Sequence, residues 1–488
     1  MGLSSVLKEA KELAKVAKDI YHEAQAQAAA ANTVDRDGSD AEQDPEADTA
    51  EEPAKLPAVL MATADLDKCI ASCLQKFNKI VGTCQKAGSK FTDVDFPVTT
   101  KPAKCLYTRR HKPSDEFPAP SMWKRSSEIS ERPQMFVDGV HAGDIQQGGL
   151  GSCYFLGALA AIAAHKEHLE SLIIAHDLQV GIVAVRFFKN NKWQAVIIDD
   201  YIGLKSDGSI LYASCKDQDE FWVPLLEKAY AKLHGSFESI DGGWTYQAIM
   251  DMTGGAGFLT PCEQLGSPES CFAHLDSLLR KKAILGACLQ PGNNQDLSNA
   301  ADAAGIFTSL LEELDHVIAD DGTFWMSAED FMIYFSMIDA CRTFTSDWVV
   351  TTTFGYFPAT DENARFLRLD SKAKQDVGKS VIVLSQRDRR TERRLSLLNI
   401  EEVQLSLSIY RCLEGDYNPS TKSFGELQED RRKLCALREL VVEMDLDPRY
   451  VYTLKVNPPV VAEGVTYKTA LHFFLRVFAT MDIRLEAL

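Results

Sequence analysis

Asp144-Ile-Gln-Gln-Gly-Gly-Leu-Gly-Ser-Cys-Tyr-Phe-Leu156 is the stretch that decides the fold, and it leads into an apolar helix candidate at residues 157–164. Glycines ahead of a cysteine let the backbone approach a substrate closely. A helix directly behind Cys153 favours the thiolate, because its dipole and free N–H groups stabilise the anion. The Gln147 side-chain amide could join the Cys153 N–H in facing a developing oxyanion. The stretch predicts a cysteine nucleophile, although a cysteine before an apolar helix is more often a buried structural thiol.

Further blocks follow this stretch in a fixed order. They occupy residues 181–188, 196–200, 220–238, 251–255 and 321–331. Together with the Cys153 stretch they resemble the calpain family of cysteine endopeptidases over about residues 92–345. Two residues at the nucleophile depart from the family pattern, since Ser152 and Tyr154 stand where calpains usually have Asp and Trp. The resemblance implies a papain-like core with lobe one at 92–235 and lobe two at 236–345.

The partners of the nucleophile are missing from this pattern. A cysteine of this type needs a histidine and an orienting Asn or Asp, about 130 to 150 residues downstream in papain-like chains. Calpains carry them in Gly-His-Ala-Tyr and Asn-Pro-Trp-Gly motifs, and neither motif occurs in this sequence. The family's blocks resume at Ile318, as though both strands had been cut out near residues 305–307. His274 and His316 are the substitutes in the right half, and both are more typical of exposed helix residues.

The sequence therefore predicts a calpain-like cysteine endopeptidase of intracellular proteins whose catalytic triad is incomplete. Removing the base from a triad lowers turnover on the order of a million-fold, with a residual of roughly a few thousand-fold over water. The alternative is an inactive pseudoprotease that binds proteins as a scaffold or regulator. A splice product or a faulty gene prediction would explain the same gap.

The resemblance also implies a calcium site in lobe one. Its ligands would be the carbonyls of Val137 and Gly139 with the carboxylates of Asp144 and Glu220, an all-oxygen set that suits a hard cation. Asp144 could equally cap the nucleophile turn. The second family site needs an Asp-Gly-Glu turn, which reads Asp-Gly-Thr at residues 321–323, so no second site is expected. The sequence contains no EF-hand loop pattern.

Two regions, each with its own spacing of apolar residues, flank the predicted core. Residues 1–90 contain two amphipathic helix patterns, separated at 33–55 by a segment with nine Asp or Glu, two Pro and no aromatic residue. That composition predicts a disordered linker. Residues 346–488 alternate apolar and polar side chains in several short runs, which predicts an antiparallel β-sandwich. Trp348 and residues 381–388 and 474–478 resemble the C2-like domain of calpains, so the predicted fold class is α+β.

Composition limits the partners and the compartment. A net charge of −18 argues against nucleic acid, because phosphate binding requires a basic patch, and protein substrates or clients are expected instead. Twelve cysteines without a Cys-x-x-Cys pair are typical of reduced thiols in the cytoplasm. The longest apolar run, residues 154–164, is too short to span a bilayer. Gly2 begins a myristoylation pattern, but Val6 stands where Ser or Thr is required, so lipid anchoring is not the expected outcome.

Overall fold

The computed structural model describes residues 64–488 apart from these segments: 109–113, 115–116, 165, 290–325, 346, 358–362, 372–375, 389–404, 419–423, 434–437 and 459–470. The predicted helix at residues 1–32, the acidic segment 33–55 and His316 lie outside the described residues. The chain groups into two units, and one of them comprises residues 1–55, 265–277 and 289–334. Each unit is described by itself below.

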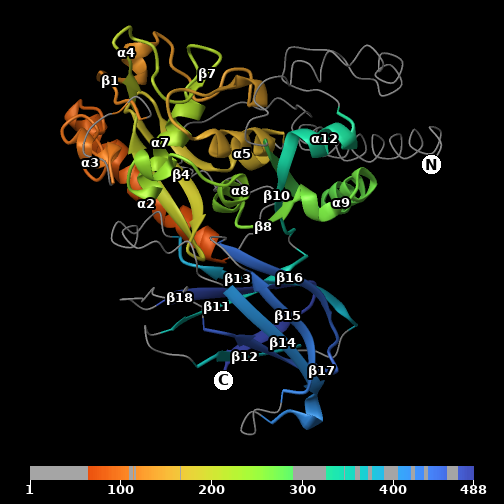
Figure 1. Cartoon of the computed structure of the whole chain (residues 1–488). Coiled ribbons are helices and arrows are strands. Elements are labelled where there is room, and N and C mark those ends of the chain that lie inside the picture. Colours follow the sequence, from red (N-terminus) through yellow and green to blue (C-terminus); the bar gives the residue numbers. More distant parts are fainter. Residues whose placement is uncertain are drawn as a thin grey trace, which may run out of the picture. The chain divides into compact units, whose positions relative to one another are not determined.

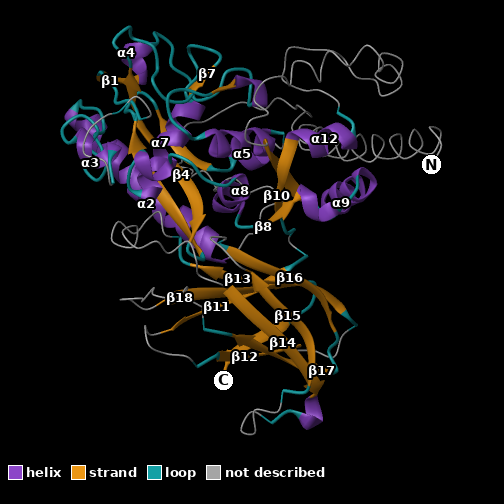
Figure 2. Ribbon diagram, viewed as in Figure 1, coloured by secondary structure: helices purple, strands orange, loops and turns teal. Residues whose placement is uncertain are grey.

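Residues 64–253, which include the predicted lobe one, combine helices with small antiparallel sheets (Figures 1 and 2). One sheet has the order β3-β4-β5, formed by Ile173–Asp177, Ile182–Lys189 and Lys192–Asp199. Two further strand pairs are β1 (Met122–Arg125) with β6 (Tyr201–Leu204), and β2 (Ile145–Gln146) with β7 (Ser214–Cys215). The helices are α2 (Ala64–Ala87), α3 (Pro102–Leu106), α4 (Ser126–Ile129), α5 (Cys153–Ala163), α6 (Lys166–Glu170), α7 (Trp222–His234) and α8 (Thr245–Thr253), with short 3-10 turns η1 (Ala142–Asp144) and η2 (Glu238–Ile240).

The core of this lobe is built around α5 and α7. The Phe155 ring of α5 stacks on the Tyr230 ring of α7 with 4.3 Å between ring centroids. Both side chains are fully buried, as expected for the apolar face of a helix packed in a core. Helix α7 ends at Gly235, whose φ of +96° is the left-handed conformation that glycine adopts readily. The two helices thereby hold the segment before Cys153 against the rest of the lobe.

Helix α2 coincides with the second amphipathic pattern of the sequence. Its Cys73 and Phe77 are buried against Ile182 and Ala184 of β4 and Ile197 of β5. The apolar face of this helix thus covers one face of the β3-β4-β5 sheet. Residues Lys68, Lys76 and other charged side chains of the helix stay exposed.

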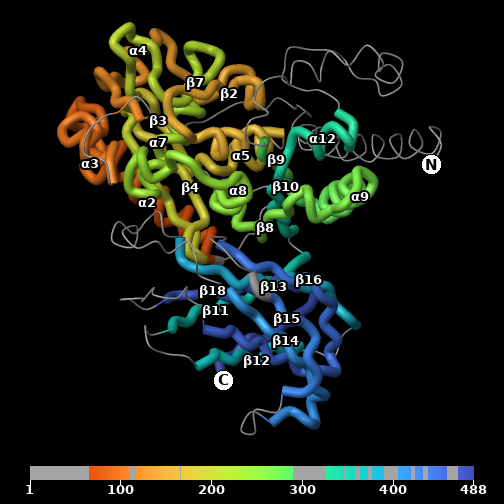
Figure 3. The backbone as a smooth tube through the Cα atoms, in the orientation of Figure 1, coloured from red at the N-terminus to blue at the C-terminus, as the bar shows by residue number. Residues whose placement is uncertain are grey.

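Residues 256–342 contribute a three-stranded sheet with the order β8-β10-β9, in which β8 and β10 are antiparallel. Its strands are β8 (Ala256–Pro261), β9 (Ala283–Leu289) and β10 (Phe335–Arg342), and Figure 3 traces the backbone through them. The 3-10 turn η3 (Cys262–Leu265) and helix α9 (Pro268–Arg280) follow β8, and helix α12 (Ala328–Tyr334) precedes β10.

The C-terminal region consists of two antiparallel sheets that share one core. The first has the order β11 (Val349–Phe357), β18 (Leu471–Ala479), β13 (Gly378–Gln386), β16 (Glu439–Leu446). The second has the order β15 (Glu426–Lys433), β14 (Leu405–Leu413), β17 (Tyr450–Val456), β12 (Arg365–Ser371), β19 (Ile483–Ala487). Buried side chains from both sheets, including Leu384, Leu475, Leu407 and Leu454, form a single cluster. The fold is therefore mixed helix and sheet, and the predicted α+β class is confirmed at that level.

Strand β13 is buried on both faces. Ile382 and Leu384 point into the core between the two sheets, whereas Val381 and Val383 pack with Ala256 and Phe344. The sequence of a strand that is covered on both faces is a continuous apolar run and does not alternate between apolar and polar residues. This burial on both faces explains why residues 381–384 are all apolar. The contacts of Val381 and Val383 also join the sandwich to Ala256 and Phe344.

Candidate active site

Cys153 is the first residue of α5 and its side chain is exposed. The three residues that follow it, Tyr154, Phe155 and Leu156, are buried. The N–H groups of Phe155 and Leu156 donate to the Ser152 carbonyl at 2.8 and 3.0 Å. The thiol therefore lies in solvent at a helix N-terminus. This is where the sequence placed it, and its role as nucleophile stays a prediction.

The loop before Cys153 is held by hydrogen bonds from segments that are remote in sequence. Gly149 N donates to Leu211 O at 2.7 Å, and Gly151 N donates to the Asp241 carboxylate at 3.1 Å. Gly242 N returns a hydrogen bond to Gly151 O at 2.8 Å. These contacts fix the loop from both sides, so the position of Cys153 is set before any substrate arrives.

Gly148 has no room for a side chain. A Cβ atom built on it would lie 2.0 Å from the Tyr212 carbonyl oxygen, far inside van der Waals contact. The sequence attributed the glycines of this loop to a close approach by substrate. At Gly148 the close approach is instead to the protein's own backbone, which packs the loop against residues 211–213.

Gln147, the predicted second oxyanion donor, has an exposed side chain. Its amide Nε2 donates to the Leu150 carbonyl at 3.2 Å, within the same loop. This hydrogen bond differs from the expected arrangement beside the Cys153 N–H. The role of Gln147 in an oxyanion hole stays a prediction.

Glu227 is a component of the site that the sequence did not reveal. Its side chain lies in the middle of α7, 1% exposed, where Oε1 accepts the Ser152 hydroxyl at 2.6 Å. Oε2 accepts the Ala213 N–H at 2.9 Å. Burial raises the pKa of this carboxyl group to about 7, although both hydrogen bonds act in the opposite direction. The only signal in the sequence was an acidic residue directly after the apolar run at residues 221–226.

Cys288 in β9 is a second thiol within electrostatic reach of Cys153. Its Sγ donates to Asp339 Oδ2 at 3.1 Å, and Asp339 Oδ1 accepts the Tyr246 N–H at 3.0 Å. Burial, the Asp339 carboxylate and the neighbouring thiols Cys153 and Cys262 raise the pKa of Cys288 to about 12. Lobe two therefore contributes a protonated thiol to the surroundings of Cys153, and the sequence analysis did not anticipate it.

Within the ranges that the structure describes, no hydrogen bond or ion pair joins a histidine ring to Cys153. His274 lies on α9, within residues 265–277, and these residues belong to a different unit from Cys153. His234 Nδ1 donates to Tyr230 O at 2.9 Å, and the His234 side chain is fully buried.

The predicted calcium ligands come from two segments, since Val137, Gly139 and Asp144 lie in residues 137–144 and Glu220 lies just before α7. Val137 N donates to Glu220 Oε1 at 3.0 Å. Burial raises the pKa of Glu220, and the charge of Asp144 adds to that rise, so the two carboxylates are close enough to repel each other. A Cβ atom on Gly139 would lie 2.9 Å from Lys166 Nζ, which places an ammonium group beside the loop. Two repelling carboxylates fit a hard cation, and a calcium ion would compete there with Lys166.

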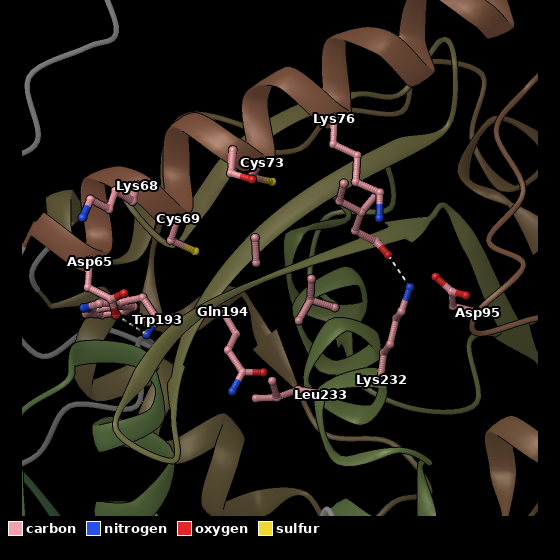
Figure 4. A pocket seen from close by; sticks show the side chains of 14 residues that line it. Asp65, Lys68, Cys69, Cys73, Lys76, Asp95, Trp193, Gln194, Lys232 and Leu233 are labelled. Carbon is pink, nitrogen blue, oxygen red and sulfur yellow. Dashed lines mark hydrogen bonds between the residues drawn. The ribbon is translucent and has the colours of Figure 1, made fainter. Parts of the chain in front are cut away.

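A cavity of about 570 Å³ lies elsewhere in lobe one, between α2, β5 and the end of α7. Figure 4 shows Cys69, Cys73 and Lys76 on the helix side of this cavity. Asp65 accepts the Trp193 N–H at 3.1 Å, and Lys232 donates to Ile197 O at 2.7 Å. None of the residues that line it belongs to the nucleophile loop, so it is separate from the Cys153 site.

An exposed thiol at the start of a helix, on a glycine loop fixed by the surrounding lobe, is the arrangement of a cysteine protease nucleophile. Residues 91–308 match the family described as calpain family cysteine protease. The match covers residues 91–308, and for this region the resemblance to calpain family cysteine proteases read from the sequence is confirmed.

Similar proteins carry the same family name. The chain is 32% identical over 310 residues to calpain-type cysteine protease ADL1 of Oryza sativa subsp. japonica, covering 53% of this chain and 14% of that protein. It is 27% identical over 435 residues to calpain-9 of Mus musculus, covering 73% and 61%. With calpain-A of Drosophila melanogaster the identity is 29% over 325 residues, covering 55% and 38%. The chain thus spans less than two thirds of the length of each of these relatives.

No described helix is both long enough and apolar enough to cross a lipid bilayer.

Proposed function

We propose that the chain is a calpain-type cysteine endopeptidase acting on proteins, with Cys153 as its nucleophile. The observation that supports this is the exposed Cys153 thiol at the first position of α5, on a loop fixed by Leu211 and Asp241. The Cys153 N–H offers one donor to the oxyanion that forms when the thiolate attacks a peptide carbonyl. Gln147 supplies a second donor when its amide turns away from Leu150 O.

Proton transfer is the weak step of this mechanism. Collapse of the tetrahedral intermediate needs a proton on the leaving amine, which an imidazolium normally gives. The sequence lacks both family motifs that would bring the histidine and its orienting asparagine. Binding and the oxyanion donors alone retain roughly a few thousand-fold acceleration over water, so the expected hydrolysis is slow.

The missing motifs favour a second function in which the domain binds proteins without cutting them. The nucleophile loop is fully anchored by hydrogen bonds within the protein, so it does not need a catalytic histidine to hold its shape. A pseudoprotease would use the same lobes to recognise clients and would leave their peptide bonds intact.

A cytoplasmic location and a calcium ion complete the proposal. Every one of the eleven cysteines in the described ranges is a free thiol, which suits a reducing compartment. Calcium would be held by Asp144 and Glu220 with the carbonyls of Val137 and Gly139, where it would neutralise two carboxylates that now repel each other.

Rescue with imidazole separates the two functions. A denatured, fluorescently labelled protein substrate is incubated with the chain with and without added imidazole, since a small base can replace a missing histidine side chain. Endopeptidase function predicts slow cleavage that imidazole accelerates in the wild type and that Cys153→Ala abolishes. Binding of the same substrate without cleavage in either condition would support the scaffold and overturn the endopeptidase.

A further inference from the structure

A buried carboxylate contacts the loop that carries the nucleophile. Glu227 Oε1 accepts the Ser152 hydroxyl at 2.6 Å, and Glu227 Oε2 accepts the Ala213 N–H at 2.9 Å. Ser152 is fully buried and immediately precedes Cys153. Both oxygens of the carboxylate are thus taken by neutral donors, and one of these donors belongs to the nucleophile loop.

No cation offsets the charge of Glu227 among the described residues. Lys228 follows it on α7, but the Lys228 ammonium contacts Asp199 instead. Tyr212 faces it from the neighbouring loop, and the Glu227 charge adds to the effect of burial in raising the pKa of that phenol. Asp241 also contacts the nucleophile loop, through the N–H of Gly151. The carboxylate is therefore stabilised by dipoles alone, and burial raises its pKa to about 7.

A glutamine would fit this position without a charge. Its carbonyl oxygen could accept the Ala213 N–H and its amide could donate to Ser152, so no ionised group would be buried. A glutamate differs from it in one respect, because it can exist in two protonation states with different hydrogen bonds to the loop.

We propose that Glu227 is a positioning residue for the nucleophile, whose gain or loss of a proton reverses the hydrogen bond to Ser152 and thereby changes the reactivity of Cys153. The inference rests on the proposed role of Cys153. In the ionised state, Oε1 accepts the Ser152 hydroxyl in a charge-assisted hydrogen bond. When Oε1 gains a proton it becomes the donor, and the Ser152 hydroxyl must direct its own hydrogen elsewhere. The Ala213 N–H still donates to Oε2, so the reversal of direction falls on the nucleophile loop alone.

The test is the rate at which iodoacetamide alkylates Cys153, where the thiolate displaces iodide. The rate is followed from about pH 5 to about pH 9 by mass spectrometry of the peptide that contains Cys153. The wild type should show an added rise centred near pH 7, reaching about tenfold over Glu227→Gln, as one charge-assisted hydrogen bond allows. Glu227→Gln should follow a single thiol ionisation curve.

Three further variants test whether the effect is specific to the Glu227–Ser152 hydrogen bond. Ser152→Ala should also lose the added rise, and the Ser152→Ala/Glu227→Gln double variant should lose no more than either single variant, because the two residues act through one bond. Asp241→Asn should retain the rise, since its amide oxygen still accepts the Gly151 N–H. Circular dichroism at each pH confirms that every variant is folded.

Superimposable profiles for wild type and Glu227→Gln would overturn the inference, and so would a rise of opposite sign or one that survives in Ser152→Ala. Alkylation needs no peptide hydrolysis. A chain that binds but never cleaves substrate can therefore still show the rise, in which case only the endopeptidase proposal fails. A chain that cleaves substrate with profiles that coincide retains the proposed function and loses the inference.

Discussion

Lys189 Nζ lies 3.0 Å from Asp251 Oδ2, and both side chains are 1% exposed. The same ammonium contacts Asp388, while Arg438 lies 2.6 Å from Asp251 and 3.0 Å from Asp388. These four residues form a charge cluster with two cations and two carboxylates. His234 adjoins it and stays neutral, because burial and Lys189 lower the pKa of its imidazole to about 4. The cluster joins β4, α8 and the C-terminal sandwich at one buried point.

Lys189→Met should destabilise the protein strongly. The substitution leaves the charge cluster with two buried carboxylates and one cation, and breaking a buried pair typically costs about 3–5 kcal/mol. Urea unfolding gives the change in free energy. Lys379→Met is the matched control, because Lys379 pairs with Asp445 on the surface and exposed pairs contribute about 0–1 kcal/mol. Equal urea midpoints for Lys189→Met and Lys379→Met would show that the buried charge cluster stabilises the protein no more than the surface pair does.

Glu227→Gln should gain stability over the wild type as the pH rises. The pKa of Glu227 is raised from its ordinary value of 4.5 to about 7 in the folded protein. Its contribution to stability is therefore complete below pH 4.5 and is lost as the pH rises through about 7. The variant avoids this loss, which is on the order of 3 kcal/mol at alkaline pH.

Urea unfolding of the wild type and Glu227→Gln at several pH values between about 5 and 8 measures this difference. The free energy of unfolding should diverge between the two proteins as the pH rises from about 5 to about 7, and the difference should level off above that. A constant difference across all pH values would mean that Glu227 does not titrate where its burial places it.

Gly148→Ala should lower the reactivity of Cys153. The new Cβ would meet the Tyr212 carbonyl at 2.0 Å, so the loop has to move away from residues 211–213. Gly157→Ala is the matched control, because nothing lies within 4 Å of a Cβ there and the residue is inside α5. Alanine in that helix position should add about 0.5–1 kcal/mol of stability. Labelling of Cys153 with iodoacetamide should slow in the first variant and stay unchanged in the second.

Calcium should raise the melting temperature of the wild type but not of Asp144→Asn. The ion would relieve the repulsion between Asp144 and Glu220, and binding to the folded state alone stabilises it by mass action. Asp207→Asn is the control, since Asp207 is exposed and bonded to Ser209. Differential scanning fluorimetry with calcium chloride gives the shift. An equal shift in both variants would place the calcium effect outside this loop.

The sequence predicted the elements and missed the contacts between them. The Cys153 stretch identified the family and the start of α5, because a nucleophile loop requires particular residues within a few positions of one another. The alternating runs near residues 405–409 and 450–456 predicted strands, since one face of each is buried in the sandwich core. These are local patterns, and local patterns are visible in a single sequence.

The contacts of the nucleophile loop depend on residues that are distant in the chain. Glu227 binds Ser152 across 75 positions, and no periodicity links an acidic residue in a helix to a serine in an earlier loop. Gly148 was assigned to substrate approach because its actual neighbour, Tyr212, is equally remote. The calcium ligands were carried over from a family resemblance, which names positions and not the hydrogen bonds they make here. Gln147 was assigned from its place in the chain before Cys153, which does not reveal that its amide donates to Leu150 O.

The measurement that tests the central claim most directly is covalent capture of Cys153 by a peptide bearing an electrophilic ketone at its C-terminal end. Intact-mass and peptide mass spectrometry locate and time the adduct. The account predicts one adduct, at Cys153, formed faster than on the partly exposed Cys69 and absent from Cys153→Ala. Equal labelling of Cys153 and Cys69, or an adduct that persists in Cys153→Ala, would contradict the assignment of Cys153 as the protease nucleophile.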